Sequence, residues 1–246
     1  MMMFVTGGSR GIGRAIVLNG IREGHDVAFT YVRNAGLARE VEQEACALRP
    51  GARCRAHQLD VRQAADVERV SEAVLEDVES VDVVVCNAGT NRDNLLVSMS
   101  DDEWHDVIAT NLHGSFYVCR AFLPAMLANR FGRIVLISSI VHNGATGQSN
   151  YCASKAALHG LAGSIAKEYG RRGITANVVI PGFFDTPMTR ETLPAANKEF
   201  WIKYCPAGRI GELDEIAKVV TFLASDGGGF INGQAIPVTG GLDWVV

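Results

Sequence analysis

Tyr151 and Lys155 stand four residues apart at the start of an apolar, helix-like run. Residues at positions i and i+4 of a helix lie on one face, so the phenol and the ammonium would be neighbours. A free phenol has a pKa of about 10 and donates protons poorly near neutral pH, but a nearby positive charge lowers that pKa. We therefore interpret the pair as a candidate general acid and base. The same spacing is common on helix surfaces, so the other elements of the chain decide its meaning.

Two further hydroxyl groups, those of Ser138 and Ser139, follow the apolar stretch 133–137, which predicts a buried strand. Ligand sites of parallel sheets lie beyond the C-terminal ends of the strands. The loop 140–150 then leads to Tyr151. Both serines are therefore candidates for the same site.

A glycine-rich loop follows the first predicted strand, 2–6, and precedes a helical run at 14–22. Its glycines are Gly7, Gly11 and Gly13, spaced G-x-x-x-G-x-G. Glycines permit tight turning and close approach of a ligand to the backbone, and a helix N-terminus attracts a pyrophosphate. The position after the first strand favours a nucleotide-binding loop over a simple glycine turn.

The second predicted strand, 26–32, indicates which dinucleotide would bind. Sites that prefer NAD place an acidic residue near the end of this strand, for the ribose 2′-hydroxyl. Here residues 31–34 read YVRN, without an acid. Arg33, together with Arg10 of the glycine loop, would suit a 2′-phosphate, which predicts NADP(H). The alternative for Arg33 is a solvated loop charge.

Other strand ends carry small or polar residues. Asp60 and Val61 follow the strand expected at 53–59, and Asn87, Ala88 and Gly89 follow the continuous apolar strand 81–86. Asp60 could accept a hydrogen bond from an adenine amino group, or it could cap the helix expected at 64–78.

Strands and helices alternate along the whole chain. Strands are predicted at 2–6, 26–32, 53–59, 81–86, 133–137, 174–180 and 235–238, and helices at 14–22, 35–49, 64–78, 100–112, 115–128, from about 151, and 213–223. A long irregular segment, 183–209, exceeds a simple turn and is typical of a functional lid. This order predicts a single α/β domain, 1–246, with a doubly wound, mainly parallel seven-stranded sheet of the Rossmann type and helices on both faces.

Composition excludes several classes of protein. The chain has 246 residues, of which 48% are hydrophobic and 20% charged, and its net charge is −4. It has no basic field for nucleic acid and no apolar run of about 20 residues for a membrane span. Six cysteines are scattered without a C-x-x-C pattern, which indicates reduced thiols in a cytoplasmic protein rather than a disulfide or metal site. The N-terminal residues run directly into the glycine loop and do not resemble a secretion signal.

The motifs together resemble those of the short-chain dehydrogenase/reductase family, in the same order and over essentially the whole chain. They are Thr6-Gly7-x-x-x-Gly11-x-Gly13, Asn87-Ala88-Gly89, Asn111, the serine pair, Tyr151-x-x-x-Lys155 and Pro181-Gly182. Further stretches, at 92–96, 100–104, 171–177 and 208–211, are similar to the 3-oxoacyl-[acyl-carrier-protein] reductases of fatty-acid synthesis. The resemblance implies an NADPH-dependent reductase of 3-oxoacyl thioesters, in fatty-acid or related polyketide and aryl-polyene synthesis.

The resemblance also implies a role for each site residue. Tyr151 would protonate the ketone oxygen, and Lys155 would hold the nicotinamide ribose and lower the tyrosine pKa. Asn111 would anchor a water that relays protons to Lys155. A serine would hydrogen-bond the ketone oxygen, and the strand motif matches the family with Ser139 in this role. Twelve residues usually separate that serine from the tyrosine, but only eleven follow Ser139; the family spacing would fit Ser138, which we expect to be a strand-end hydroxyl on the substrate side.

The residues expected to bind NADP(H) lie in the glycine loop, at the strand ends and in the catalytic pair. They are Gly7, Ser9, Arg10, Gly11, Ile12, Gly13, Arg33, Asp60, Val61, Asn87, Ala88, Gly89, Tyr151, Lys155, Pro181, Gly182 and Thr186.

Two partners are expected from the resemblance. Acyl carrier protein is acidic, so its docking site should be basic. Arg130 and Arg172 match docking positions of the resembled reductases, with ordinary surface charge as the alternative. Relatives are usually tetramers built through the helices near 115–128 and 151–169 and the C-terminal strand, so we expect a homotetramer.

The substrate side departs from the resembled reductases in two places. The shortened loop carries His142, which is either a substrate contact or a solvated histidine. The lid carries Phe200, Trp201 and Tyr204 where relatives have aliphatic and charged residues. These rings either pack the lid or line a pocket for an aryl or unsaturated acyl chain. Reductases of CoA thioesters or small ketones, and a non-catalytic dinucleotide-binding protein, are the alternative functions.

Overall fold

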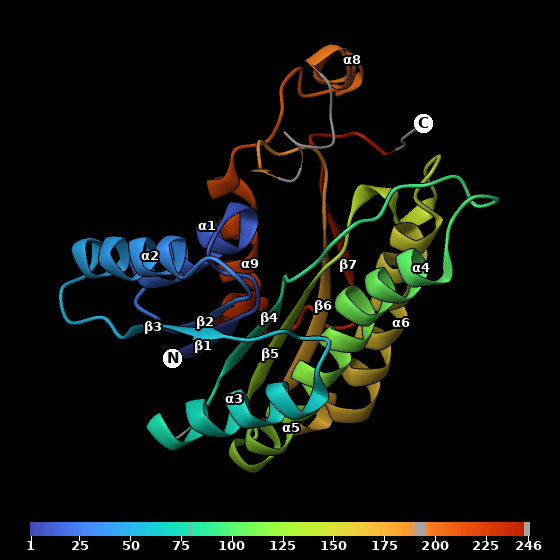
Figure 1. Ribbon diagram of the computed structural model, residues 1–246. Helices are drawn as coiled ribbons and strands as arrows, with labels where there is room; N and C mark the ends of the chain where they lie inside the picture. The colour runs from blue at the N-terminus through green and yellow to red at the C-terminus, as the bar shows by residue number, and fades with distance from the viewer. Residues whose placement is uncertain (79, 188, 190–194, 244–246) are drawn as a thin grey trace.

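A seven-stranded parallel sheet forms the centre of the molecule (Figure 1). The computed structural model describes residues 1–78, 80–187, 189 and 195–243. The strand order is β3-β2-β1-β4-β5-β6-β7, and every neighbouring pair is parallel. The order reverses direction between β1 and β4, which is the switch point where ligands of doubly wound sheets bind. The predicted fold class is confirmed.

The strands are short and mostly apolar because they are covered on both faces. Their bounds are β1 Met2–Val5, β2 Asp26–Tyr31, β3 Cys54–Gln58, β4 Val83–Cys86, β5 Gly132–Ile137, β6 Ile174–Pro181 and β7 Ala235–Val238. Successive side chains point to opposite faces. In β5, Ile134 and Leu136 therefore enter one core, whereas Val135 and Ile137 enter the other.

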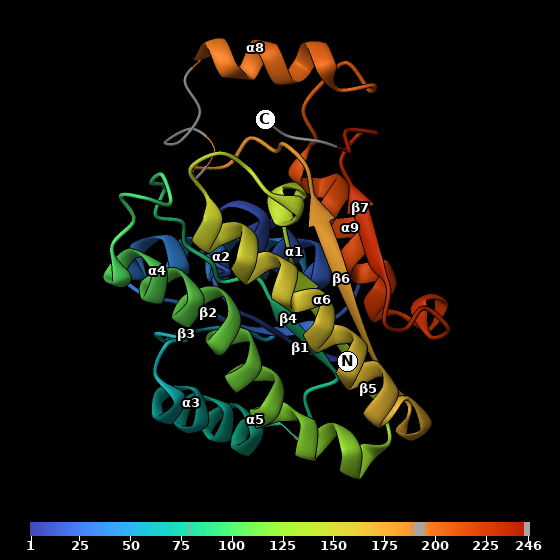
Figure 2. The same ribbon diagram turned by 90° about the vertical axis from the view of Figure 1, so that its right-hand side faces the viewer.

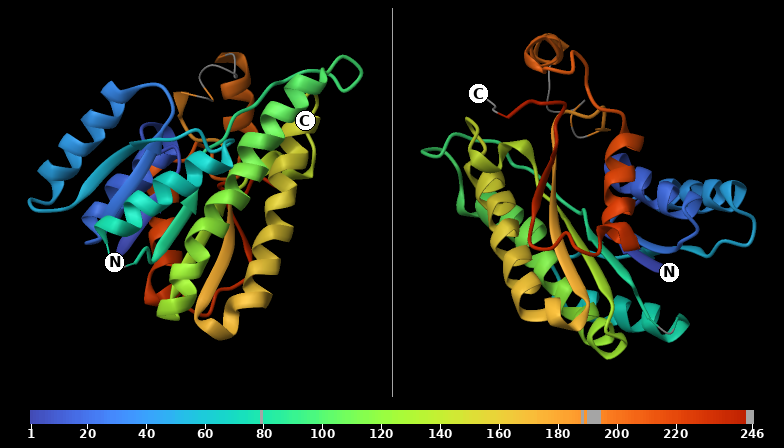
Figure 3. Two further views of the ribbon diagram at one scale, coloured as in Figure 1. Left: turned by 60° about the horizontal axis from the view of Figure 1, so that its bottom comes forward. Right: turned by 180° about the vertical axis from the view of Figure 1, so that it is seen from behind.

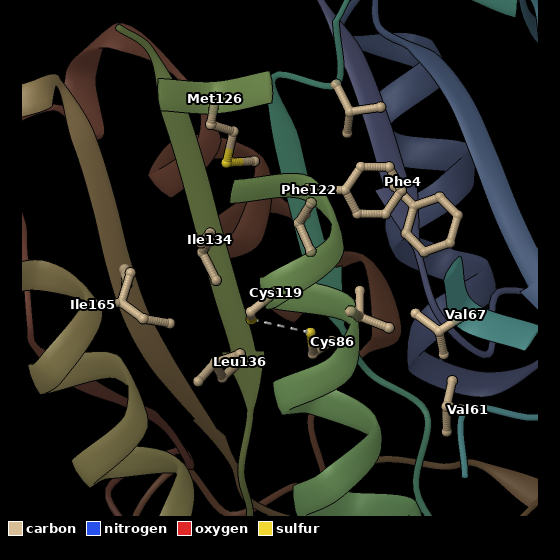
Figure 4. Close-up of a cluster of buried hydrophobic side chains, with 14 of the residues drawn as sticks. Phe4, Val61, Val67, Cys86, Cys119, Phe122, Met126, Ile134, Leu136 and Ile165 are labelled. Atoms are coloured by element: carbon tan, nitrogen blue, oxygen red, sulfur yellow. Dashed lines mark hydrogen bonds between the residues drawn. The ribbon is translucent and has the colours of Figure 1, made fainter. Parts of the chain in front are cut away.

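Helices cover both faces of the sheet, as Figures 2 and 3 show. One face carries α1 Gly11–Arg22, α2 Ala35–Leu48 and α9 Leu213–Ala224. The other carries α3 Ala64–Asp77, α5 Gly114–Asn129 and α6 Ser149–Tyr169, with α4 Asp101–Ile108 leading into α5. Figure 4 shows the core on the second face, where the rings of Phe4 and Phe122 lie 4.6 Å apart and the thiols of Cys86 and Cys119 lie 3.9 Å apart.

Two elements differ from the sequence-based expectation. The predicted helices 100–112 and 115–128 are one continuous helical run, because a π turn at Ala109–His113 joins α4 to α5. The segment 183–209, expected to be irregular, contains helix α8, Ala195–Tyr204. This helix lies beyond the C-terminal ends of the strands (Figure 2).

No helix within the described part of the chain is both long enough and apolar enough to cross a membrane.

Candidate active site

The first turns of α6 carry Tyr151 and Lys155 to the C-terminal end of β5. The Lys155 ammonium is buried and donates a hydrogen bond to the carbonyl oxygen of Ile137, at 2.8 Å. The same nitrogen lies 5.6 Å from the centre of the Tyr151 ring. The helix spacing therefore brings the two groups to one place, with the lysine anchored to the last residue of the strand.

Ser139 shares this place with Tyr151. The Ser139 hydroxyl lies close to the phenol of Tyr151 and, as a hydrogen-bond donor, lowers the pKa of that phenol. Ser139 is in an extended conformation and caps a short 3₁₀ turn, Ile140–Asn143, where its oxygen accepts from the backbone N–H of Val141 at 3.4 Å. Two neighbouring hydroxyls can each donate a hydrogen bond to one ligand oxygen once that oxygen replaces their contact with each other.

Ser138 faces away from this pair. Its side chain is 2% exposed, and its hydroxyl donates to the carbonyl oxygen of Lys155 at 2.9 Å. Successive residues of a strand point to opposite faces, so only one serine of the pair can reach the same side as Tyr151. The expected position of Ser138 on the substrate side is therefore wrong, because its hydroxyl is bonded within the protein interior.

The π turn places Asn111 behind Tyr151. The buried Asn111 side chain accepts from the N–H of Thr90 at 2.9 Å and donates to the Thr90 carbonyl at 3.0 Å. It also donates to the hydroxyl of Ser154 at 2.9 Å, and Ser154 in turn donates to the carbonyl of Tyr151 at 2.7 Å. Asn111 thus ties the loop after β4 to the first turn of α6. The water-anchoring role of Asn111 stays a prediction.

Burial shifts the pKa of both members of the pair, in opposite directions. Desolvation raises the pKa of Tyr151 to about 12, and its hydrogen bond with Ser139 opposes only part of this rise. Desolvation lowers the pKa of Lys155 to about 8. The net shift of the Tyr151 pKa is upward because loss of water around the phenol dominates. The lowering contribution expected from Lys155 stays a prediction.

The glycine loop packs tightly against the residues that follow β4. Gly7 has a positive φ of 66°, and a Cβ on Gly13 would lie 2.2 Å from the Gly7 carbonyl oxygen. The side-chain amide of Asn87 donates to the carbonyls of Thr6 and Gly7, at 2.9 and 3.1 Å. Glycine is thus required where the first turn of α1 crosses the loop.

A pyrophosphate fits the start of α1. The N-cap residue of this helix, Arg10, makes no side-chain capping bond, and no acidic residue occupies the first turn. The first N–H groups of the helix can therefore receive an anion.

A Cβ on Gly89 would lie 3.4 Å from the Lys155 nitrogen and 3.3 Å from the Asn111 amide oxygen, so the absence of a side chain keeps space open beside the lysine.

The C-terminal end of β6 closes the other side of this space. Gly182 packs so tightly on Thr239 that a Cβ would come within 2.8 Å of the Thr239 Cα. Thr186 is buried and shares hydrogen bonds with Thr189. A Cβ on Gly11 would meet the Thr186 side chain at 3.6 Å, which puts this threonine against the glycine loop.

The residues expected at the adenosine end are arginines and Asp60. Arg10 and Arg33 are exposed, and neither forms an ion pair with any other described residue. The Asp60 carboxylate binds the guanidinium of Arg62 at 2.6 Å, and these hydrogen bonds lower the Asp60 pKa. Helix capping by the Asp60 side chain is wrong, because Gln63 is the N-cap of α3.

Helix α8, in the segment expected to be a lid, contacts the 3₁₀ turn after Ser139 through the ring of Trp201. Trp201 is 9% exposed and stacks on Phe183, with ring centres 4.5 Å apart. The same cluster includes Ile140 of the 3₁₀ turn and Leu242 near the C-terminus. Tyr204 is 44% exposed, so it does not share the buried face of Trp201. The side chain of Phe200 lies outside the described residues.

Arg130 and Arg172 lie at the opposite end of the sheet. Arg130 ends α5 in a left-handed conformation just before β5 begins, and Arg172 belongs to a 3₁₀ turn just before β6. A strand of six residues spans roughly 20 Å. The length of β5 therefore separates both arginines from the site of their own chain.

Two site residues escaped the sequence analysis. His159 on α6 lies with its Nε2 atom 3.4 Å from the Ser138 hydroxyl, and Ser154 joins Asn111 to the backbone of Tyr151. Both lie on the inner side of α6, at three and eight residues beyond Tyr151, and that spacing could have indicated them.

Comparisons with known proteins agree with this geometry. Residues 7–243 match the family model described as "Enoyl-(Acyl carrier protein) reductase". The 3-oxoacyl-[acyl-carrier-protein] reductase FabG of Pseudomonas aeruginosa is 45% identical over 97% of this chain and 95% of its own. The protein of the same name from Escherichia coli is 43% identical over the same shares. The crystal structure of levodione reductase superimposes with a TM-score of 0.94 at 31% identity, over 98% of this chain and 96% of that one.

The chain belongs to the short-chain dehydrogenase/reductase family. It is accordingly an oxidoreductase that interconverts a carbonyl and an alcohol and uses a nicotinamide dinucleotide. Within that family, the two curated relatives above are both reductases of 3-oxoacyl groups on acyl carrier protein.

Proposed function

We propose that the protein reduces a 3-oxoacyl thioester, carried on acyl carrier protein, to the 3-hydroxyacyl thioester with NADPH. The process would be fatty-acid synthesis or a related polyketide or aryl-polyene synthesis. The observation that carries the proposal is that the hydroxyls of Ser139 and Tyr151 lie together beside the buried Lys155. Two full-length relatives with this activity support the choice of substrate.

The side chains divide the work on the ketone oxygen. When bound, the nicotinamide dinucleotide would supply a hydride to C3 of the substrate. Ser139 donates a hydrogen bond to the oxygen, which stabilises the negative charge that develops there. Tyr151 gives its phenolic proton to the same oxygen and completes the alcohol. Lys155 holds a positive charge close to the phenol and so favours departure of that proton.

A Tyr151→Phe variant tests this assignment. It removes one oxygen and keeps the ring that packs in the site. We expect binding of NADPH close to the wild type, while kcat for an acetoacetyl-carrier substrate falls on the order of 10²- to 10⁴-fold, the usual contribution of a positioned acid. Full reductase activity in this variant would contradict the mechanism.

Preference for NADPH rests on Arg10 and Arg33. Both guanidinium groups are exposed beside the loop and the strand end where a 2′-phosphate would lie. We expect kcat/KM to favour NADPH over NADH by more than tenfold, and Arg33→Ala to remove most of that ratio while leaving the NADH rate unchanged. A wild-type preference for NADH would contradict this part of the proposal.

Carrier protein and CoA thioesters need to be compared directly. Arg130 and Arg172 are candidates for carrier docking, and their distance from the site of their own chain implies that a docked carrier would serve the site of a neighbouring subunit. Reversing both charges (Arg130→Glu with Arg172→Glu) should raise KM for the carrier substrate and leave the CoA analogue unaffected. An equal effect on both substrates would indicate a structural role.

Two other activities deserve the same assay. The likeness to levodione reductase favours small cyclic ketones as an alternative, and the family description favours reduction of an enoyl thioester. A panel of acetoacetyl, crotonyl and cyclic diketone substrates separates the three, because each proposed activity turns over a different member of the panel. A protein that binds NADPH and turns over none of them would be a non-catalytic binding module.

The setting of the enzyme is also part of the proposal. We propose a homotetramer, supported by exposed aromatic rings on the helical face and near the C-terminal edge of the sheet. All six cysteines are free thiols, which suits a reducing compartment such as the cytoplasm. The segment 183–209, with Trp201 against the catalytic loop, would act as a lid over the acyl chain.

A further inference from the structure

Two histidine rings lie stacked directly behind the serine pair. His142 belongs to the 3₁₀ turn after Ser139, and His159 lies on α6, two turns beyond Tyr151. Their ring centres are 4.6 Å apart and the ring planes differ by 20°. Both side chains are half-buried. The earlier alternative, in which His142 is a solvated loop residue, is therefore wrong.

His142 holds the main chain of Ser139 at two points. Its backbone N–H donates to the Ser139 carbonyl at 3.0 Å, and its ring Nδ1 lies 2.9 Å from the same oxygen. A carbonyl oxygen can only accept, so Nδ1 must carry a proton. In the neutral ring, Nε2 is then the unprotonated nitrogen.

His159 contacts Ser138, and its ring is in the tautomer opposite to that of His142. The single proton of the Ser138 hydroxyl is given to the Lys155 carbonyl at 2.9 Å. The hydroxyl oxygen can then only accept from His159 Nε2, at 3.4 Å, so that nitrogen carries the proton. Each serine thus has one imidazole N–H directed at it, and the ring stack joins the two.

The turn held by His142 also touches the lid. Ile140 and Val141 belong to this turn, and both pack in the cluster that contains Trp201. The Val141 N–H is the group that donates to the Ser139 hydroxyl. A shift of the turn would therefore move the hydroxyl of Ser139 and the contact surface of the lid together.

We propose that His142 and His159 are positioning residues that hold Ser139 in reach of Tyr151, with His142 acting directly on the serine main chain and His159 supporting its ring. The proposal rests on the role proposed for Ser139. Neither ring needs to touch the substrate or gain and lose a proton. A misplacement of about 1 Å at a reacting group can lower the rate on the order of a hundredfold, so a small movement of this turn would be measurable.

Matched pairs of variants separate hydrogen bonding from packing. In His142→Asn, the side-chain amide nitrogen can occupy the position of Nδ1, whereas His142→Leu has no donor. In His159→Gln, the amide nitrogen can replace Nε2, whereas His159→Leu cannot. We expect His142→Leu to lower kcat on the order of tenfold to a hundredfold with NADPH affinity unchanged, and His142→Asn to retain at least about a third of wild-type kcat by the same reasoning. Among the His159 variants, His159→Leu should lower kcat more than His159→Gln, and both losses should be smaller than those of the matching His142 variants.

A control and a second readout keep the test decisive. His57→Leu replaces a half-buried histidine on β3, far along the sheet from the site, and should leave kcat unchanged. Long-range ¹H–¹⁵N spectra of the wild type should show His142 protonated at Nδ1 and His159 at Nε2, whether or not the substrate has been identified. The proposal is overturned if His142→Leu keeps wild-type kcat, if His142→Asn loses as much as His142→Leu, or if the spectra show the opposite tautomers. Absence of 3-oxoacyl reductase activity in the wild type would instead count against the proposed function.

Discussion

At the scale of single residues, burial gives Tyr151 and Lys155 different working ranges of pH. With a pKa of about 12, the phenol keeps its proton throughout the neutral range and can serve as a donor. With a pKa of about 8, the Lys155 ammonium is present below that pH and is lost as the pH rises through it. Any loss of function at moderately alkaline pH should therefore come from the lysine.

We expect the affinity for NADPH to weaken as the pH rises through about 8, because deprotonation of Lys155 removes the charge beside the cofactor site. Lys155→Arg should remove this pH dependence, since the guanidinium stays protonated throughout the measured range. Fluorescence titrations of NADPH from pH 6 to 10 provide the measurement. Tyr151→Phe is the control and should keep the wild-type profile. An unchanged profile in Lys155→Arg would assign the pH dependence to another group.

The sequence indicated the side chains that meet at the site but not all of their directions. Alternation along β5 separates Ser138 from Ser139, and the strand motif chose the same serine that the structure brings to Tyr151. The bond from Ser138 to the Lys155 carbonyl could not be read from spacing, because it depends on how closely α6 approaches β5. The stacking of His142 on His159 could not be predicted from the sequence either, because it also depends on the approach of α6 to the end of β5.

At the scale of elements, most strands were predictable because they are continuous apolar runs. Helices such as α9 were predictable because their apolar residues recur at helical spacing. The π turn at Ala109–His113 was not, since it inserts a wider turn without any helix-breaking residue. Asn111 lies within this turn and is buried, and its side chain contacts Thr90 and Ser154. Helix α8 was missed because it lacks an amphipathic stripe of the kind that α9 has.

The lid should discriminate between acyl chains through Trp201. Aromatic contacts contribute about 0.5–1.5 kcal/mol beyond burial, or roughly two- to tenfold. We therefore expect Trp201→Ala to raise KM by that factor for aryl-conjugated 3-oxoacyl thioesters, with a smaller change for short aliphatic ones and none in NADPH affinity. Tyr204→Ala, which changes an exposed ring on the same helix, is the matched control. Equal losses on both substrate series would leave Trp201 as lid packing only.

At the scale of the whole molecule, the apolar surface indicates where subunits would meet. Phe116 and Trp104 are 42% and 36% exposed on the α4–α5 face, and Phe222 and Phe230 are 51% and 102% exposed near β7. Large exposed rings gathered on two surfaces are typical of protein interfaces. Of these residues, Phe116 lies on α5 and Phe230 lies in the loop before β7, and both elements are among those through which the proposed tetramer would form.

Phe230→Asp should dissociate the proposed tetramer without unfolding the chain, because this side chain contacts solvent fully in the single subunit. Leu48→Asp, an equally drastic change at the exposed end of α2, should leave the assembly intact. Light scattering coupled to size-exclusion chromatography gives the mass of each variant, and circular dichroism verifies folding. A tetramer of Phe230→Asp, or a wild-type monomer, would contradict the proposed assembly.

The strand order has a consequence for the synthesis of the protein. β1 pairs with β2 on one side and with β4 on the other, so its second edge is satisfied only when Val83–Cys86 becomes available. Val83 lies 78 residues beyond Val5, which at about 5–20 residues per second corresponds to roughly 4 to 16 seconds of translation. During that interval the nascent chain carries an apolar strand with an open edge. Such edges recruit other strands, so the growing polypeptide should depend on chaperones until β4 has left the ribosome.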